Sequence, residues 1–288
     1  MKTNIVMKIV IFGNTFKKDT VAEVARILEF MRCNGVEVLL SQELRNEMNL
    51  RDSYAPFTDE LTDTVDFALS VGGDGTVLNT VAQVLEHNIP VLGINCGHLG
   101  FLAEAQAKDV ERICRQLVSN DYTIEQRSML RVSTNDGWQM GSPFALNEIA
   151  VMKQELSSMI AVEMHINGEL LHTYHADGVL ISTPTGSTAY NLSVGGPLVA
   201  PQAKVMIISP IATHSLNVRP LVIPDDCFID MKISSRSHSY LISIDGRSQT
   251  FREEVTLHIE KAANTVKLVQ LGEHSFFDTL KDKLSWGS

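Results

Sequence analysis

Short apolar runs alternate with stretches of helical period over the first part of the chain. The apolar run Lys8–Gly13 predicts a buried first strand, and the apolar spacing over 21–33 predicts a helix. Thr20, with Glu23 three residues later, fits a capping box at the start of that helix. Further strands are predicted at 36–40, 67–71 and 89–95, and further helices at 76–87 and 109–119. Strands and helices in alternation predict βαβ units and a largely parallel sheet.

After about residue 126 the apolar and polar residues alternate with the period of two that is typical of strands. One alternating run meets Asn167-Gly168 and another meets Asp245-Gly246, and both dipeptides are strong hairpin signals. Further alternating runs lie at 130–134, 255–259 and 266–271. The last stretch, 276–286, has a helical pattern and is expected to pack back on the first domain.

These patterns predict an α/β N-terminal domain with a largely parallel sheet and a β-rich antiparallel C-terminal domain. The first domain is predicted to span 1–126, with the tail 272–288 returning to it. The second is predicted to span 127–271. We find no internal repeat and no low-complexity segment in the sequence.

Composition and charge narrow the function classes. The 288 residues are 44% hydrophobic and 20% charged, as in an ordinary soluble globular protein. The formal net charge of −10 disfavours nucleic-acid binding, and no apolar stretch approaches the roughly 20 residues of a membrane span. No small-residue cleavage pattern follows the N-terminal apolar run, so a cytoplasmic protein is expected. The cysteines are scattered and no HExxH occurs, so no protein-held metal site is expected.

A glycine-rich turn, Gly72-Gly73-Asp74-Gly75-Thr76, lies between a predicted strand and a predicted helix. Glycines permit positive φ and close approach to a ligand, and a helix N-terminus offers free amides to a phosphate. Gly72, Gly73, Gly75 and Thr76 are therefore a candidate phosphate loop, with Asp74 free to meet a hydroxyl. A plain strand-to-helix turn with Asp74 as N-cap explains the same residues. The motif is neither a P-loop nor the GxGxxG fingerprint.

A hydroxyl-dense segment follows an apolar strand at 179–181. Between Ser182 and Ser193 seven side chains carry a hydroxyl, around a Pro-Thr-Gly centre. Such hydroxyls can bind phosphates and ribose, and Tyr190 offers a flat face to a base. A polar turn with local Ser/Thr-to-backbone bonds is the alternative. Asn147-Glu148 is a third candidate, because an amide beside a carboxylate suits a ribose diol, although a solvated strand end is the better explanation of the pair taken alone.

Together these segments resemble the NAD kinase family. GGDG, the following NxGxLGF (Asn95 to Phe101), Asn-Glu and DGxxxSTPTGSTAY stand in the family's order and spacing, over nearly the whole chain. GGDG is shared with diacylglycerol and sphingosine kinases and with phosphofructokinases, so it indicates only a superfamily. The STPTGSTAY segment is much more specific.

The resemblance implies a nucleotide site in the cleft between the two domains, with Asp74 as the proton acceptor. The residues that it implies in NAD binding are Asp74, Gly75, Asn147, Glu148, Ser158, His175, Asp177, Thr185, Thr188, Ala189, Tyr190, Asn191, Leu192, Ser193, Ala212 and Arg247. This chain has Asn79 where many relatives have a basic residue, and Arg247 where glutamine is frequent. His175 occupies a position that varies among relatives with different preference for NAD⁺ or NADH.

The implied reaction transfers the terminal phosphate of ATP to the adenosine ribose 2′-hydroxyl of NAD. A divalent cation, Mg²⁺ or similar, is expected to enter with the triphosphate. Relatives imply a homodimer or homotetramer. Two alternatives stay open: another GGDG kinase acting on a lipid or sugar, and a dinucleotide-binding regulator without catalysis. The chain shows no amphipathic basic helix for a membrane surface, and a pure binder has no need of Asp74.

Overall fold

The computed structural model describes residues 7–15, 18–50, 53–56, 64–97, 100–103, 105–137, 141–155, 158–272 and 275–285. The chain divides into two compact units, Met1–Gln126 with Val266–Ser288 and Arg127–Thr265. Within the described ranges, no helix is both long enough and apolar enough to cross a membrane.

The first unit contains one mainly parallel sheet in the strand order β3-β2-β1-β4-β5-β20-β7, with β6 beside β5. The pairs β1–β2, β1–β4, β4–β5 and β5–β20 are all parallel. Its strands are β1 (Lys8–Gly13), β2 (Glu37–Leu40), β3 (Ala55–Pro56), β4 (Phe67–Gly72), β5 (Val91–Asn95), β6 (Ala105–Gln106), β7 (Thr123–Arg127) and β20 (Val266–Gln270). Its α-helices are α1 (Lys18–Cys33), α2 (Gln42–Glu47), α3 (Asp74–Val84), α4 (Val110–Val118) and α6 (Phe276–Leu284), and its 3₁₀ turns are η2 (Leu85–His87) and η3 (Ala107–Asp109).

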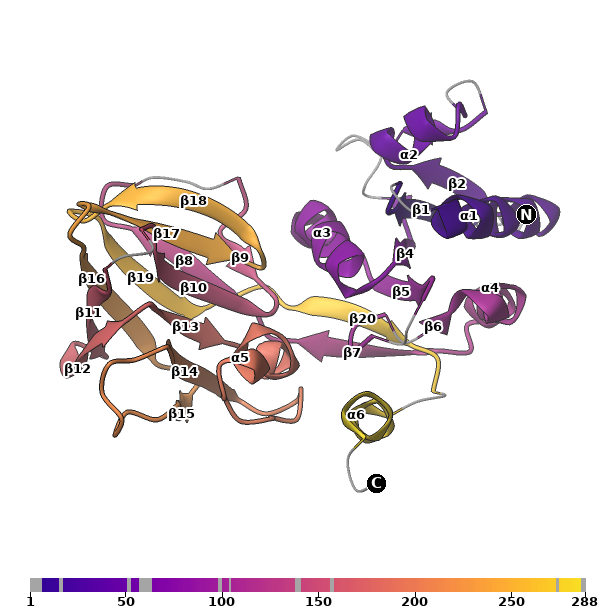
Figure 1. Cartoon of the computed structure of the whole chain (residues 1–288). Coiled ribbons are helices and arrows are strands. Elements are labelled where there is room, and N and C mark those ends of the chain that lie inside the picture. The colour runs from indigo at the N-terminus through magenta and orange to yellow at the C-terminus, as the bar shows by residue number, and fades with distance from the viewer. Residues whose placement is uncertain are drawn as a thin grey trace. The chain divides into compact units, whose positions relative to one another are not determined.

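Helices cover both faces of this sheet (Figure 1). Helices α1 and α4 bury Val24, Ile27 and Ile113 in one core with the strand residues Ile9 and Leu69. Helix α3 packs against β4 and β5 from the other side. Because both faces are covered, every residue of β4 and β5 is buried, and the strands read as continuous apolar runs rather than as alternating ones.

Two sequence-based expectations for this unit are wrong. Helix α1 begins at Lys18, so Thr20 lies inside its first turn with a buried hydroxyl and is no capping-box residue. Strand β20 was expected in the antiparallel half, as part of a second domain ending at 271. It pairs in parallel with β5, through Leu268 and Val91, and so belongs to the first unit. Local alternation identifies a strand but carries no information about which sheet the strand joins.

The second unit is built from two six-stranded antiparallel sheets, in the orders β15-β14-β13-β10-β17-β18 and β12-β11-β16-β19-β8-β9. Its strands are β8 (Leu130–Thr134), β9 (Phe144–Ala145), β10 (Glu148–Lys153), β11 (Ile160–Ile166), β12 (Glu169–Ala176), β13 (Gly178–Ser182), β14 (Val205–Ile211), β15 (Leu221–Pro224), β16 (Phe228–Ser234), β17 (Ser239–Ile244), β18 (Arg247–Arg252) and β19 (Thr256–Lys261). A 3₁₀ turn, η4 (Thr185–Thr188), and a short helix, α5 (Tyr190–Ser193), follow β13.

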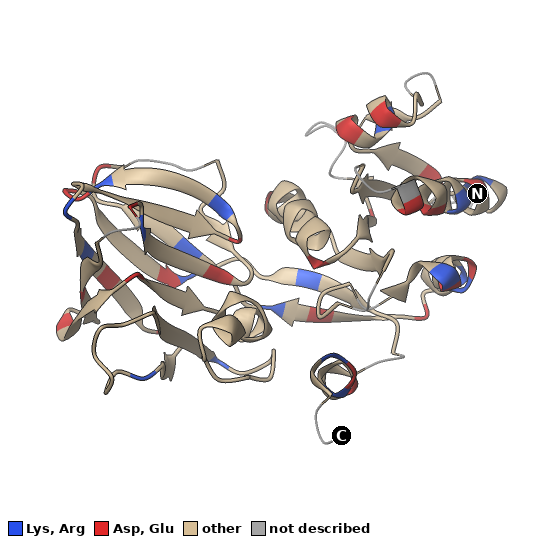
Figure 2. Cartoon of the chain, in the orientation of Figure 1, with Lys and Arg blue, Asp and Glu red and all other residues tan. Residues whose placement is uncertain are grey.

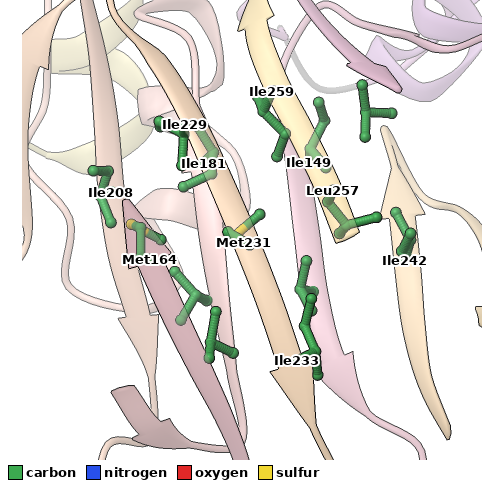
Figure 3. Packing of buried hydrophobic residues seen from close by; sticks show 14 of the residues in the cluster. Ile149, Met164, Ile181, Ile208, Ile229, Met231, Ile233, Ile242, Leu257 and Ile259 are labelled. Atoms are coloured by element: carbon green, nitrogen blue, oxygen red, sulfur yellow. The ribbon is translucent and has the colours of Figure 1, made fainter. Parts of the chain in front are cut away.

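One apolar core joins the two sheets of this unit. Ile149, Ile181 and Ile208 from the first sheet pack with Met231 and Leu257 from the second (Figure 3). In β16 and β19 buried residues alternate with exposed or half-buried ones, as the period of two predicts. The predicted fold class, parallel in the first half and antiparallel in the second, is therefore confirmed.

Both predicted hairpin turns are present. Asn167 and Gly168 have φ of 52° and 82° between β11 and β12, and Asp245 and Gly246 have 47° and 81° between β17 and β18. Positive φ at both central residues is the type I′ arrangement, which suits the twist of the flanking strands.

Candidate active site

The glycine-rich turn connects β4 to α3, with Gly73 as the N-cap of the helix. A Cβ on Gly72 would lie 2.2 Å from Thr76 Oγ1, whereas a Cβ on Gly73 or Gly75 would meet nothing within 4 Å. None of these three glycines has a positive φ, so their shared property is the lack of a side chain rather than an unusual backbone. The main chain at Gly73 and Gly75 therefore faces open space at a helix N-terminus.

A pocket of about 430 Å³ opens at this turn, within the first unit. It lies at the carboxyl ends of β1 and β2, where ligands of open α/β sheets bind. Its walls are Phe12, Gly13, Asn14, Thr15, Ser41, Glu43, Gly73, Gly75, Thr76, Asn79, Thr80 and Gln83. These described lining residues include neither Lys nor Arg. Elsewhere, Lys and Arg are interspersed with Asp and Glu along the elements of each unit (Figure 2).

The Asp74 carboxylate accepts three consecutive main-chain amides. Its Oδ2 accepts from Phe101 N at 2.9 Å, and its Oδ1 accepts from Leu102 N at 3.1 Å and Ala103 N at 3.0 Å. A Cβ on Gly100 would lie 1.9 Å from Oδ1, so this close approach requires glycine there. The expectation that Asp74 is free among glycines is wrong, because the loop after β5 fixes both of its oxygens. His98 and Leu99 of the same motif lie outside the described residues.

In the second unit, the hydroxyls of the segment after β13 mostly bind the protein itself. Ser182 Oγ donates to the carbonyl of Asn147 at 3.3 Å, and Thr183 Oγ1 donates to that of Leu146 at 2.6 Å. Ser187 Oγ donates to Val199 O at 3.1 Å. These buried side chains hold the turn in shape, as the polar-turn alternative proposed.

The accessible part of this segment is its helical end. Tyr190 and Ser193 are exposed, and Thr188, Ala189 and Leu192 are half-buried. Asn191 is fully buried, and its side chain bonds Pro197 O at 3.1 Å and Ser209 Oγ at 2.7 Å. The Asn191 amide thus shapes the turn from inside, while Tyr190 and Ser193 face solvent.

Asn147 and Glu148 lie directly beside this turn. Glu148 pairs with Ser182 across β10 and β13, and the amide of Tyr190 donates to the Glu148 carboxylate. Thr183 N donates to Asn147 O at 2.9 Å. A Cβ on Gly186 would lie 2.1 Å from that same carbonyl, so the turn can pack this closely only with glycine. The structure therefore places Asn147 and Glu148 beside the turn that carries Thr185, Gly186 and Tyr190.

Glu148 is held in an unfavourable electrostatic environment. Burial, and then the negative charge of Asp245, raise the pKa of its carboxyl from 4.5 to about 7, against the lowering effect of the Tyr190 amide. Its Oε2 atom is buried and has no hydrogen-bond partner within the described part of the chain. A buried carboxylate oxygen without a donor is costly for the fold alone, and such strain is common where a ligand supplies the missing donor.

Arg247 stabilises the segment that leads into Asn147 and Glu148. Its guanidinium donates to Ile244 O at 3.2 Å and to Phe144 O at 2.9 Å. Both acceptors are main-chain carbonyls of the second unit, so this side chain ties β18 to the segment that leads into β10. The hypothesis that Arg247 is a hairpin residue with a local role fits these bonds.

The remaining predicted residues form a separate group at the opposite end of β13. Asp177 bonds Lys153 Nζ at 2.7 Å, and its amide donates to Ile211 O at 3.0 Å. His175 is exposed on β12, Ala212 follows β14 with φ of 46°, and Ser158 precedes β11. The four residue steps of β13 separate this group from the hydroxyl-rich turn by about 13 Å. The structure thus divides the predicted residues of this unit into two groups.

Comparison with known protein families identifies both halves of the chain. Residues 9–122 match the ATP-NAD kinase N-terminal domain, and residues 146–271 match the ATP-NAD kinase C-terminal domain. The chain belongs to the NAD kinase family. The resemblance drawn from its motifs is therefore confirmed, and the chain is a phosphotransferase with an alcohol group as acceptor.

Individual NAD kinases are similar along almost their whole length. The NAD kinase of Bacteroides fragilis is 43% identical over 98% of this chain and 99% of its own length. That of Flavobacterium psychrophilum is 38% identical, covering 98% of both chains. Among solved structures, an NAD kinase from Archaeoglobus fulgidus in complex with ATP has a TM-score of 0.77 and 27% identity, covering 97% of this chain and 99% of its own. The fold also matches yeast NADH kinase complexed with NADH, with a TM-score of 0.88 and 23% identity over 99% of this chain and 89% of that one.

Two residues of this NAD kinase family member escaped the sequence-based reasoning. Asp245 was interpreted only as half of a hairpin dipeptide, although its carboxylate bonds three amides of the Asn147 segment. The sequence motif assigns Gly100 no role, but in the structure its missing side chain makes room for the Asp74 carboxylate. Asn suits the first position of such a hairpin turn as well as Asp does. The choice of a charged residue was therefore the one sequence signal that Asp245 has a role beyond the turn.

Proposed function

We propose that the chain transfers the terminal phosphate of ATP to the adenosine ribose 2′-hydroxyl of NAD, giving NADP and ADP. The observation that carries this proposal is the pocket at the N-terminus of α3, with the open main chain of Gly73 and Gly75, in a chain of the NAD kinase family. A coupled assay that detects NADP with an NADP-specific dehydrogenase tests it. NADP must form only when NAD and ATP are both supplied. If a folded preparation forms no NADP from NAD and ATP, the proposal is wrong.

The triphosphate is proposed to bind in the 430 Å³ pocket, with the amides of the glycine turn as donors. No Lys or Arg is among its described lining residues, and Asn79 stands there instead of a basic side chain. Within the described residues, no group of three His, Cys, Asp or Glu could hold a metal ion. We propose that a divalent cation enters on the triphosphate. When bound, such an ion neutralises the phosphate oxygens and polarises the terminal phosphorus.

Asp74 is proposed as the acceptor of the 2′-hydroxyl proton. The 2′ O–H bond breaks as the bond from that oxygen to the terminal phosphorus forms and the bond from phosphorus to ADP breaks. Three amides already donate to Asp74, which fixes the carboxylate and leaves one of its roughly four lone-pair sites, on Oδ2, for a hydroxyl. A carboxylate cannot deprotonate an alcohol beforehand, so the proton moves late, and alignment supplies most of the acceleration.

In the second unit, NAD is proposed to bind Asn147, Glu148, Thr185 and the helical end at 188–193, with the hydroxyls of one of its two riboses near Glu148. The unpartnered Oε2 of Glu148 supports this, because a ribose hydroxyl would supply the donor that it lacks. In the first unit, Gly75 is a proposed NAD contact on the strength of the family resemblance. Ser158, His175, Asp177, Ala212 and Arg247 remain proposed contacts on the strength of the family resemblance. A cytoplasmic location and a homodimer or homotetramer are proposed on the same basis.

Replacing Tyr190 by Ala is expected to raise KM for NAD about five- to tenfold and to leave KM for ATP unchanged. The substitution removes an exposed ring that can stack on a base, but keeps the amide that donates to Glu148. Steady-state kinetics with each substrate varied measure this. Phe228→Ala is the matched control, because Phe228 is 38% exposed against 37% for Tyr190 in the same unit. An equal rise in both KM values contradicts stacking.

Replacing His175 by Gln is expected to change the ratio of kcat/KM for NAD⁺ to that for NADH by about two- to fivefold. Only the oxidised nicotinamide ring is cationic, so a neighbouring polar side chain discriminates the two forms electrostatically. His175 is exposed on β12 and available for such a contact. His172→Gln, on the same strand and also exposed, is the control. A ratio unchanged by His175→Gln leaves His175 as a surface residue only.

A further inference from the structure

Asp245 occupies the first turn position of the β17–β18 hairpin and points its carboxylate at another part of the unit. Its Oδ2 accepts from Leu146 N at 2.7 Å, and its Oδ1 accepts from Asn147 N at 2.8 Å and Glu148 N at 3.0 Å. Its own amide donates to Glu148 O at 3.1 Å. One residue therefore makes four hydrogen bonds to three consecutive residues that lie about 100 positions earlier in the chain.

The turn itself does not require this carboxylate. The β11–β12 hairpin has nearly the same backbone, with Asn167 at φ 52° against 47° for Asp245. There the side-chain oxygen of Asn167 accepts one amide, that of Phe228, at 3.0 Å. Asn and Asp both tolerate the left-handed region, so an uncharged residue suffices for the hairpin. The negative charge and second oxygen of Asp245 serve the segment that it binds.

The bound segment is the part of β9–β10 that carries Asn147 and Glu148. On its other side, Thr183 Oγ1 bonds Leu146 O at 2.6 Å and Thr183 N bonds Asn147 O at 2.9 Å. The main-chain amides and carbonyls of this segment are thus all hydrogen-bonded within the protein. Only its side chains are left to bind a ligand. Within the described part of the chain, no hydrogen bond engages the Asn147 side-chain amide or the Glu148 Oε2 atom.

We propose that Asp245 is a positioning residue of the NAD site: it fixes Asn147 and Glu148 through hydrogen bonds to their main-chain amides. This proposal rests on the proposed function, since it presumes that Glu148 accepts hydrogen bonds from NAD. Asp245 acts through these neighbours and does not itself touch the substrate.

The charge coupling follows from what faces Glu148. Asp245 approaches it from the turn between β17 and β18, the Tyr190 amide approaches it from α5, and Arg247 lies on β18 close to Asp245. Burial and the Asp245 charge together raise the pKa of Glu148 to about 7. Burial also raises the pKa of Asp245, while the three amides and Arg247 act to lower it. If the ionised Glu148 binds NAD, kcat/KM for NAD falls as pH drops through about 7, and removing the Asp245 charge moves this fall to lower pH.

Asp245→Asn tests the proposal, because Asn keeps the turn conformation and the side-chain size while it removes the charge and one acceptor. We expect KM for NAD to rise roughly tenfold with KM for ATP unchanged. The reason is that Asn147 and Glu148 lose part of the hydrogen bonding that positions them, and binding residues without such support bind their ligand less well. We also expect the acidic limb of the kcat/KM profile for NAD to move to lower pH. Asn167→Asp is the matched control on the other hairpin, and both of its kinetic constants should equal those of the parent.

Two outcomes overturn the proposal: kinetic constants that stay at parental values while only thermal stability falls, or KM values for NAD and ATP that rise together. If Asp245→Asn does not fold, Glu148→Gln gives the second test. If the acidic limb of the kcat/KM profile for NAD persists in Glu148→Gln, Glu148 is not the group whose ionisation causes that limb, and the proposed coupling to Asp245 is excluded. NAD binding is also measured directly by calorimetry on the parent and on Asp245→Asn. A parent that binds NAD but forms no NADP disproves the proposed function, while weaker NAD binding by the variant still supports the role of Asp245.

Discussion

Asp74→Asn is expected to lower kcat for NADP formation by about 10²-fold or more. The substitution removes the group proposed to accept the 2′-hydroxyl proton, and it leaves the glycine turn and its pocket in place. An Asn side chain retains one oxygen, so it can satisfy only some of the amides of Phe101, Leu102 and Ala103. Some loss of stability must therefore accompany the loss of catalysis, and kinetics and thermal unfolding have to be measured on the same preparation.

Asp245→Asn separates these two effects, because both aspartates bind three consecutive amides. The structural cost of the two Asp→Asn changes should therefore be similar. Their kinetic signatures should differ: Asp74→Asn lowers kcat, while Asp245→Asn raises KM for NAD. If Asp74→Asn keeps a near-normal kcat, Asp74 is not the proton acceptor. If both variants lose kcat in proportion to their loss of stability, Asp74 has only the structural role that its amide bonds show.

The sequence predicted most elements of the fold because each rests on a local pattern. Strand β1 matches the apolar run Lys8–Gly13, and β8 matches the alternation at 130–134. The two hairpin dipeptides lie at turns with positive φ, as type I′ geometry requires. The start of α1 was misplaced, since a hydroxyl residue followed by Glu occurs inside helices as well as at their caps. Strand β20 was misplaced because its partner, β5, lies about 175 positions earlier in the chain.

The candidate site could be predicted only as far as its residues lie in motifs. Tyr190 is predicted from its ring, and Asn147 and Glu148 are predicted through the family resemblance. The pairing of β10 with β13 brings Glu148 and Tyr190 together. For the hydroxyl-rich segment the sequence leaves a ligand site and a polar turn open, and the buried hydroxyls of Ser182 and Thr183 bond carbonyls at 147 and 146. The roles of Gly100 and Asp245 depend on contacts between distant segments, which residue type and spacing do not encode.

Glu148→Gln is expected to lower kcat/KM for NAD by roughly 10- to 100-fold at pH 8 and to make the protein more stable at the same pH. The first effect follows because a hydrogen bond to a charged acceptor contributes about 1.5–3 kcal/mol, and Gln offers a neutral oxygen instead. The second follows from the strained position of the carboxylate. Its Oε2 is buried without a partner in the described structure, and the amide nitrogen of Gln can occupy that place without a negative charge.

The pH dependence gives this prediction its sign. The folded-state pKa of Glu148 is raised from 4.5 to about 7, so the folded protein binds this proton more tightly than the unfolded chain does. The parent therefore loses stability as pH rises from about 4.5 to about 7, by on the order of 1–3 kcal/mol in total. Glu148→Gln lacks this loss, so its advantage in free energy of unfolding is present at pH 8 and vanishes near pH 4.5.

Denaturant unfolding at pH 5, 6, 7 and 8 measures the advantage, with Glu163→Gln as the control. Glu163 lies on β11 in the same unit with a side chain that is 43% exposed, and its replacement should change stability by less than about 0.5 kcal/mol at every pH. A Glu148→Gln variant that is equally stable as the parent at pH 8 contradicts a strained Glu148. If Glu148→Gln gains stability and loses NAD binding over the same pH range, then ionisation of one carboxylate both weakens the fold and is required for NAD binding. The physical reason is that the buried charge of Glu148 lacks a hydrogen-bond donor until NAD supplies one.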